Sequence, residues 1–211
     1  MALLWIAQGR FRGAFWIMAL AVLIDATDGT LARLARVKER IPWFDGDRLE
    51  DVIDYLNYVF VPSYFLVRAD LLPERAALWI AALPLIASAY GFCHKEAKTR
   101  DHFFLGFPSY WNIVAFYFYV LPTPRWLNAL VIVVLSFLVF VPLRYVYPSR
   151  SPVYRSLTVA LGAVWGVLIV SIIYLLPASY PVLVFLSLLY PIYYAALSLW
   201  LEAKRWQRGE G

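Results

Sequence analysis

Cysteine and charge are both scarce in this sequence. The single cysteine, Cys93, excludes an intrachain disulfide and a cysteine-based zinc site, and we expect it to be a small buried apolar residue. Charged residues make up only 16% of the chain, against about a quarter in soluble domains, whereas hydrophobic residues make up 63%. With a mean hydropathy of +0.66, the 211 residues carry more apolar surface than a soluble fold of this size can bury. The composition therefore excludes a soluble globular protein and predicts a polytopic helical membrane protein.

Long apolar stretches predict an all-α bundle of transmembrane helices. At about 1.5 Å per residue, roughly 20 residues cross the hydrocarbon core of a bilayer. Residues 1–8 are apolar but too short to cross, and we expect them to be the end of a helix whose start is missing. No linker divides the chain, so residues 1–211 are predicted to form one integral-membrane domain. The seven predicted spans, of which the fourth is short, run near 13–35, 49–68, 75–94, 109–122, 126–147, 155–176 and 179–201.

The basic residues predict how this bundle is oriented. If residues 36–48 are cytoplasmic, alternation of the spans places 95–107, 144–155 and 203–211 on the same side. Most of the 19 Lys and Arg residues, including Arg100 and Arg208, are then cytoplasmic, as the positive-inside rule requires. This placement also accounts for the net charge of +5 without nucleic acid, and no nucleic-acid partner is expected. The basic residues left outside are Arg10, Arg12, Arg68, Arg75 and Arg125.

Acidic residues concentrate at one edge of the predicted membrane region. At about 100° per residue, Asp25 and Asp28 share one face of the first span, and Glu50 and Asp54 share one face of the second. A carboxylate at this depth costs about 3 kcal/mol unless a partner compensates its charge. Two antiparallel helices joined by a short loop would bring these oxygens together, and such a cluster suits Mg²⁺ or Mn²⁺.

Small residues accompany the acids. Gly29 and Ala32 lie on the same face as the first two aspartates, and Gly46 begins the second acidic stripe. The missing side-chain volume leaves a gap where a ligand can approach the backbone, and Arg33 beside it is suited to grip a phosphate. The simpler alternative is that the acids pair with nearby basic residues in a solvated loop and that Gly29 serves helix packing.

These residues form a spaced pattern that resembles the signature of the CDP-alcohol phosphotransferase (phosphatidyltransferase) family. That signature is Asp-x-x-Asp-Gly-x-x-Ala-Arg, a spacer, and then Gly-x-x-x-Asp-x-x-x-Asp. Glu50 departs from the family's aspartate, and its extra methylene affects metal preference or activity because Mg²⁺ demands near-ideal geometry. This sequence reads Asp25-x-x-Asp28-Gly29-x-x-Ala32-Arg33, twelve residues, and then Gly46-x-x-x-Glu50-x-x-x-Asp54.

Two further features resemble one branch of that family, the bacterial phosphatidylcholine synthases. The first is the twelve-residue spacer, which is longer than in most family members. The second is the segment Lys98–Asn112, with the sequence KTRDHFFLGFPSYWN. With these features the resemblance covers most of the chain from about Ala14 onward. The N-terminus departs from the branch, which normally has a full span before the signature helix.

The resemblance implies a reaction and its setting. The enzyme would bind CDP-diacylglycerol and a small alcohol, choline in this branch, transfer the phosphatidyl group to the hydroxyl, and release CMP. It would lie among membrane lipids in a bacterial-type inner (cytoplasmic) membrane, as a homodimer, with its active site near the cytoplasmic face.

The resemblance also implies roles for the signature residues. A Mn²⁺ or Mg²⁺ cofactor would sit against the pyrophosphate, and Asp54 would also be the base that takes the alcohol proton. The implied metal ligands are Asp25, Asp28, Glu50 and Asp54. The implied nucleotide and phosphate contacts come from Gly29, Ala32, Arg33 and Gly46.

A choline acceptor needs aromatic faces, because its quaternary ammonium has no hydrogen-bond donor. We consider four aromatic residues near the two motifs as acceptor-binding candidates. The competing explanation is strong, since a chain with 9 Trp and 15 Tyr supplies interfacial aromatic belts without any ligand. The candidates are Tyr55, Tyr58, Tyr110 and Trp111.

Two alternatives to a choline-specific enzyme stay open. The same chemistry could use serine, a glycerol phosphate or inositol phosphate, and a phosphorylated acceptor would need a basic pocket. A non-enzymatic transporter would instead spread its acids through the membrane depth, whereas here they gather at one edge, and no internal repeat is visible. The loop residues available for a basic pocket are Lys95, Lys98, Arg100, Arg144, Arg150 and Arg155.

Overall fold

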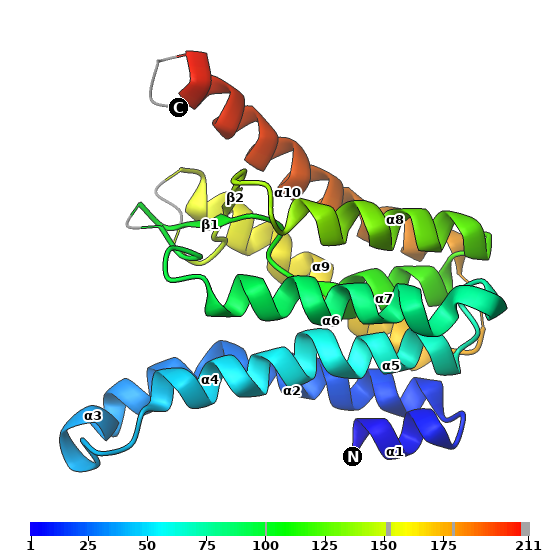
Figure 1. Cartoon of the computed structure of the whole chain (residues 1–211), viewed down its shortest axis with the longest axis horizontal. Helices are drawn as coiled ribbons and strands as arrows, with labels where there is room; N and C mark the ends of the chain where they lie inside the picture. Colours follow the sequence, from blue (N-terminus) through cyan, green and yellow to red (C-terminus); the bar gives the residue numbers. More distant parts are fainter. Residues whose placement is uncertain (100, 151–152, 179, 208–211) are drawn as a thin grey trace.

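The computed structural model describes residues 1–99, 101–150, 153–178 and 180–207, most of which form helices that lie side by side along one axis (Figure 1). A short two-stranded sheet sits at one end of this bundle. The helices are α1 (Ala2–Ala7), α2 (Phe11–Leu34), α3 (Val37–Arg40), α4 (Gly46–Asp54), the π-helix η1 (Tyr55–Phe60), α5 (Val61–Arg68), the 3₁₀ helix η2 (Glu74–Ala76), α6 (Ala77–Cys93), α7 (Trp111–Val120), α8 (Arg125–Leu138), α9 (Arg155–Leu175) and α10 (Pro181–Gln207).

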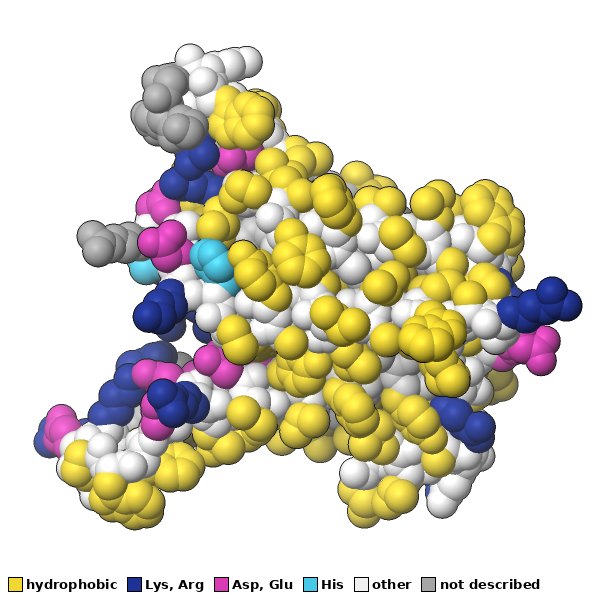
Figure 2. Space-filling view, in the orientation of Figure 1, with side chains coloured by type: hydrophobic (Ala, Val, Ile, Leu, Met, Phe, Trp, Pro, Cys, Tyr) yellow, Lys and Arg dark blue, Asp and Glu magenta, His cyan; other side chains and the backbone are white. Residues whose placement is uncertain are grey.

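The helices have the lengths and surfaces of an integral membrane protein. Within the described residues, four helices are long and apolar enough to cross a bilayer: Phe11–Leu34, Glu74–Cys93, Arg155–Leu175 and Pro181–Gln207. Two shorter apolar helices, α7 and α8, accompany them. Large apolar side chains face outward along the bundle, with Val167 66% exposed and Leu189 61% exposed. Figure 2 shows apolar side chains over the middle of the molecule and charged ones at its two ends, as a bilayer requires.

The structure corrects the predicted limits of several segments. The helix in the expected span 126–147 ends at Leu138. Residues 144–146, which the sequence predicts to continue it, form strand β2. The short span 109–122 contracts to α7. Within residues 1–8, Ala2–Ala7 form α1, which packs against α2 and α5 and buries Ala2 and Ile6. Ser179, where the last expected span begins, and the basic residues Arg100 and Arg208 lie outside the described residues.

Strands β1 (Phe103–Leu105) and β2 (Arg144–Val146) pair antiparallel, a feature that the all-α prediction lacks. Phe103 lies opposite Val146, and Leu105 lies opposite Arg144. The sheet lies at the same end of the bundle as α3 and the last turns of α10 (Figure 1). The turns that connect α5 to α6, α7 to α8 and α9 to α10 lie at the opposite end (Figure 1), so successive segments alternate in direction as the sequence predicts.

An aromatic cluster joins α2, α5 and α7 in the core. Phe15 contacts Phe65 at a ring-centroid distance of 4.7 Å and Phe116 at 5.3 Å. Tyr119 packs against Phe65 at 5.5 Å, and all three phenylalanines are almost fully buried. Such tilted and edge-on pairs add about 1 kcal/mol each beyond the burial of their area. The cluster fixes α2 beside α5, which continues the helix that carries the second acidic stripe.

That second helix runs without interruption from Gly46 to Arg68, but its middle turn is π-helical. Pro62 follows this turn and explains it. Proline has no backbone N–H, and in an ordinary helix its ring would collide with the carbonyl oxygen four residues earlier, that of Tyr58. The wider π turn at Tyr55–Phe60 relieves that collision and resets the faces of the helix immediately after Asp54.

Candidate active site

Three carboxylates converge where α2 approaches α4. Asp25 comes from α2, while Glu50 and Asp54 lie one turn apart on α4. One carboxylate oxygen from each of the three lies within 4.8 Å of the others, and Asp25 and Asp54 are half-buried. Three hard oxygen donors at this spacing fit one divalent cation of the Mg²⁺ or Mn²⁺ class. The facing stripes that the sequence predicts are thus brought together for these three residues.

The hydroxyl of Tyr58 donates a hydrogen bond of 2.7 Å to Asp25 Oδ2. Tyr58 lies in the π turn, so the widened helix carries this hydroxyl across to α2. A bonded carboxylate has less rotational freedom, and partners of this kind orient metal ligands in many sites. The π turn that follows Asp54 therefore holds the Asp25 carboxylate in place.

Asp28 lies outside this three-carboxylate group. It is exposed on α2, three residues beyond Asp25, and its charge still acts on Glu50. Its position leaves it able to contact a ligand that extends along α2 from the cluster.

The glycines of the signature stand in open space. A Cβ atom added at Gly29 would meet only Arg33 Nη1, at 3.5 Å, and one added at Gly46 would meet nothing within 4 Å. Among the described residues of this chain, therefore, neither glycine packs against another helix. Ala32 and Arg33 are exposed beside this space, and Arg33 Nη2 donates to the Thr30 hydroxyl at 3.0 Å.

The solvated-loop alternative holds for two acids that are not part of the cluster. Asp45 caps the start of α4 by accepting from the Arg48 backbone N–H at 3.2 Å. Asp47 accepts from Lys38 Nζ at 2.8 Å, and this hydrogen bond raises the pKa of the Lys38 ammonium. Throughout the described ranges, by contrast, Asp25, Glu50 and Asp54 take part in no ion pair. These three carboxylates are left available to a cation.

The structure divides the four aromatic candidates into two pairs. The Tyr55 hydroxyl donates to the Leu85 carbonyl on α6 at 2.9 Å, and Trp111 is fully buried with Nε1 bonded to Ser88 at 2.8 Å. Both serve the packing of α6. Tyr58 contacts Asp25 directly, and Tyr110, half-buried before α7, lies close enough to interact electrostatically with the same aspartate. Of the four candidates, Tyr58 is therefore the one that hydrogen-bonds to the acidic cluster, and Tyr110 interacts with it through charge.

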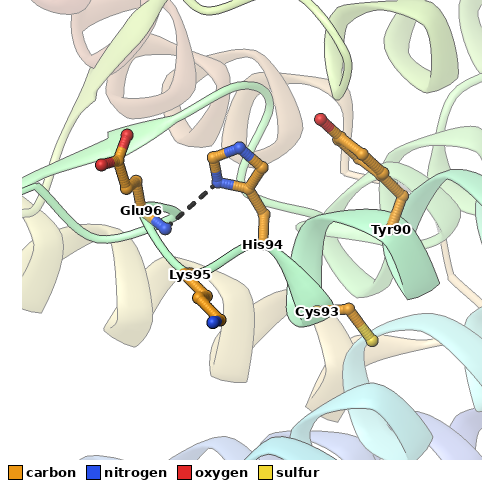
Figure 3. Close-up of a pocket in the computed structure, with 5 residues that line it drawn as sticks. All are labelled: Tyr90, Cys93, His94, Lys95 and Glu96. Carbon is orange, nitrogen blue, oxygen red and sulfur yellow. Dashed lines mark hydrogen bonds between the residues drawn. The ribbon is translucent and has the colours of Figure 1, made fainter.

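A shallow pocket of about 400 Å³ at the end of α6 does not include the acidic cluster. It is lined by Tyr90, Cys93, His94, Lys95 and Glu96 (Figure 3). The Glu96 backbone N–H donates to His94 Nδ1 at 3.2 Å, which engages that ring nitrogen. Cys93 is exposed here, contrary to the expectation of burial, because it is the last residue of α6, where the helix leaves the bundle.

Sequence reasoning did not connect Lys98 with the acids, but the structure does. The charge of Lys98 acts on both Glu50 and Asp54, although Lys98 comes from the segment between α6 and β1. Figure 2 shows the surface hollowed between the arm formed by α3 and α4 and the rest of this end, with acidic and basic side chains around the hollow. No spacing rule in the sequence relates residue 98 to residues 50 and 54, so this relation depends on the folded loop.

Comparison with known proteins places the chain in a family. No family model matches it. It is 48% identical to the phosphatidylcholine synthase of Legionella bozemanae over 69% of this chain and 67% of that protein. It is 42% identical to that of Legionella pneumophila over 92% of this chain and 79% of the relative, and 38% identical to that of Pseudomonas aeruginosa over 98% and 87%. The signature residues, the carboxylate cluster and these relatives agree: the chain belongs to the phosphatidylcholine synthases, proteins of the CDP-alcohol phosphotransferase type.

Proposed function

We propose that this protein transfers the phosphatidyl group of CDP-diacylglycerol to choline and releases CMP. The observation that carries the proposal is the cluster of Asp25, Glu50 and Asp54. Within the described residues these three carboxylates form no ion pair, and two signature glycines with open space around them lie on the same helices. A phosphoryl-transfer site works mainly by positioning and charge stabilisation, and this cluster supplies both for a pyrophosphate. The names of the relatives supply the acceptor, choline.

The proposed reaction is an in-line displacement. The choline hydroxyl oxygen bonds to the phosphorus that carries diacylglycerol, and the bond from that phosphorus to the bridging oxygen of CMP breaks. The electron pair leaves with CMP, and the hydroxyl proton goes to the Asp54 carboxylate. A Mn²⁺ or Mg²⁺ ion bound by Asp25, Asp28, Glu50 and Asp54 would neutralise charge on the pyrophosphate. Three of these residues form the compact group, whereas Asp28 lies outside it, three residues further along α2.

The remaining signature residues would bind the nucleotide. The open space at Gly29 and Gly46, with the small side chain of Ala32 nearby, accommodates the cytidine against the α2 backbone. Arg33 is exposed there, and its guanidinium can exchange the Thr30 hydroxyl for a phosphate oxygen. Tyr58 and Tyr110 would present aromatic faces to the choline ammonium beside Asp25, a combination of ring and carboxylate that suits a quaternary cation.

We further propose seven membrane crossings in the cytoplasmic membrane, with the site near the cytoplasmic face. The crossings would be α2, the helix from α4 through α5, η2 with α6, and then α7, α8, α9 and α10. The cluster lies at the end that carries α3 and the two-stranded sheet, and most of the basic residues belong to this end. The gathering of the acids at one end disfavours a transporter, whose ion path would extend through the membrane. The family resemblance leads us to expect a homodimer among membrane lipids.

The test is CMP release from CDP-diacylglycerol in liposomes with Mn²⁺ or Mg²⁺. Choline is compared with serine, glycerol 3-phosphate, inositol phosphate and no acceptor. We expect release that depends on choline and stops when a chelator removes the metal. Release with another alcohol would retain the chemistry and overturn the acceptor, and no release with any alcohol would overturn the proposed function.

A further inference from the structure

A second pocket lies at the end of the bundle opposite the acidic cluster. It has a volume of about 510 Å³ and forms where α2 begins and where α7 and α9 end. The turn between α1 and α2 lies at the same end as the turn between α9 and α10 (Figure 1). The lining includes two cations, Arg10 and Arg12, and two aromatic residues, Trp16 and Tyr119, and it includes no acid.

Arg10 is held in position by the packing of α1 on α2. Its guanidinium lies over the Trp5 ring, 4.6 Å from the ring centroid, and its backbone N–H donates to the Trp5 carbonyl at 2.8 Å. Trp5 in turn lies so close to Gly13 that a Cβ atom built on this glycine would be 1.8 Å from a ring carbon. A glycine at position 13 therefore lets the ring lie against α2 and support the arginine.

Arg12 is placed in a similar way by α9. Its guanidinium carbon lies over the Tyr174 ring, 5.6 Å from the ring centroid. A contact with the face of a ring uses none of the five N–H donors of a guanidinium. Within the described residues, neither Arg10 nor Arg12 makes a side-chain hydrogen bond or an ion pair. Both guanidinium groups are thus positioned at the pocket with their donors unused.

Positive charge prevails at this end of the molecule. Among the residues that the structure describes, the turns here carry two acids, Asp70 and Glu74, and Asp70 already pairs with Arg125. The excess of basic side chains attracts a group that brings negative charge from outside the protein. The basic residues at this end are Arg10, Arg12, Arg68, Arg75 and Arg125.

Exposed apolar side chains lead from the pocket toward the middle of the bundle. On α2, Trp16, Leu20 and Ile24 follow Arg12 at intervals of four residues, so they continue along the same side of the helix. Leu20 is 56% exposed and Ile24 is 57% exposed. A phospholipid has the matching order of groups, with its phosphate at the rim of the bilayer and its acyl chains below. A soluble phosphate would make no use of this apolar stripe.

We propose that the pocket binds the phosphate of an anionic phospholipid between Arg10 and Arg12, with an acyl chain along Trp16, Leu20 and Ile24. A guanidinium suits this role because two of its N–H donors can bind two phosphate oxygens at once. Phosphatidylglycerol, whose headgroup has no cation of its own, complements the two positive charges better than zwitterionic phosphatidylcholine does. The inference concerns the end of the bundle away from Asp25, so it does not depend on the proposed reaction.

Native mass spectrometry of the protein in detergent, titrated with phosphatidylglycerol or phosphatidylcholine, tests the inference. We expect phosphatidylglycerol to bind more tightly. Arg10→Gln and Arg12→Gln should each weaken its binding by about tenfold, the effect of losing a hydrogen bond between charged groups. Arg75→Gln is the matched control, because it removes the same charge at the same end from a residue outside the pocket. We expect this control to bind phosphatidylglycerol as the unaltered protein does.

Two further measurements separate lipid recognition from other roles of these residues. Arg12→Lys keeps the charge and should bind phosphatidylglycerol within a few-fold of the unaltered protein. An equal loss in Arg12→Lys and Arg12→Gln would show that Arg12 serves packing against Tyr174 and would overturn its role. Excess inorganic phosphate should not displace the lipid, and displacement would identify a site for soluble phosphate instead. Equal affinity for the two lipids, or equal weakening in Arg75→Gln, would also overturn the inference.

Discussion

At the scale of single residues, Asp54 has the most direct part in the proposed chemistry. Its carboxylate is half-buried within the cluster and forms no ion pair with any residue that the structure describes, which suits a base for the alcohol proton. We expect Asp54→Asn to lower turnover at least a hundredfold, within the range for loss of a general base. CMP binding should persist, because the other two carboxylates of the proposed metal site, Asp25 and Glu50, remain. Initial rates of CMP release and CMP calorimetry on the same preparation check both parts, and full activity would contradict the assignment.

Glu50 offers a second test at this scale, because it replaces the aspartate of the family signature. In the structure, a Glu50 carboxylate oxygen lies within 4.8 Å of a carboxylate oxygen of Asp25 and of Asp54. Glu50→Asp shortens the side chain by one methylene and so moves this carboxylate away from the other two. We expect this variant to remain active and to change its ratio of Mg²⁺-supported to Mn²⁺-supported rates, since Mg²⁺ tolerates poor geometry badly. Glu50→Gln, which keeps the length and removes the charge, should lose most activity with both metals. Equal metal profiles for all three proteins would exclude Glu50 as a ligand.

Tyr58 tests whether the orientation of Asp25 matters. Tyr58→Phe removes only the hydroxyl that bonds Asp25 Oδ2 at 2.7 Å. We expect Mn²⁺ affinity to fall by about tenfold, the lower end of the effect of losing such a partner. Tyr55→Phe is the matched control, since its hydroxyl bonds the Leu85 carbonyl away from the cluster. Unchanged Mn²⁺ affinity in Tyr58→Phe would show that the Tyr58 hydrogen bond is not needed to orient the Asp25 carboxylate.

At the scale of elements, the attachment of the β1–β2 sheet to the loop before it predicts a pH dependence, because Arg144 of β2 pairs with Asp101 of that loop. Burial alone would raise the pKa of Asp101, but hydrogen bonds with Thr99 and its own backbone, together with the charge of Arg144, lower it. A lowered pKa means that the stabilisation is present above the ordinary value of 3.8 and is lost as the pH falls through the lowered value. Because Asp101 is about half exposed, the effect should be below about 1 kcal/mol.

Hydrogen exchange of the backbone amides at 103–105 measures this attachment. We expect Arg144→Met to speed exchange several-fold at neutral pH, and this difference from the unaltered protein to shrink in acid as Asp101 becomes protonated. Arg40→Met is a control with a cation at the same end of the molecule, since Arg40 lies on α3 and forms no ion pair in the described part of the chain. A constant difference across the pH range would show that Arg144 acts by packing.

The elements also show where sequence reasoning succeeds and where it fails. The lengths of the apolar runs predict α2, α6, α9 and α10 well, because a run of apolar residues is a local property of the sequence. The pairing of Phe103 with Val146 joins residues far apart in the chain, so no local period announces it. The π turn has a local signal, Pro62, but a proline predicts a disturbance and not its form.

The same distinction applies to the site. Helical periodicity predicts that Asp25, Glu50 and Asp54 face one another, since both stripes and the short loop between them are visible in the sequence. Periodicity does not separate Tyr58 from Tyr55, because the π turn changes the face on which each tyrosine lies. The effect of the Lys98 charge on the cluster depends on the folded loop before β1, in which the Lys98 backbone is bridged to Phe104, and this pairing is a property of the tertiary fold.

At the scale of the whole molecule, labelling of the single cysteine measures which end of the bundle faces the cytoplasm. Cys93 is exposed at the end of α6, on the side of the bundle that carries the sheet and α3. Because basic residues are in excess at this end, we expect it to lie on the cytoplasmic side. A membrane-impermeant maleimide should therefore label Cys93 in inside-out vesicles and not in right-side-out vesicles. Cys93→Ser combined with Asp70→Cys, which moves the thiol to the turn between α5 and α6, should reverse the result. If Cys93 were labelled from outside, the acidic cluster would face away from the cytoplasm, and a cytoplasmic supply of nucleotide could not reach it.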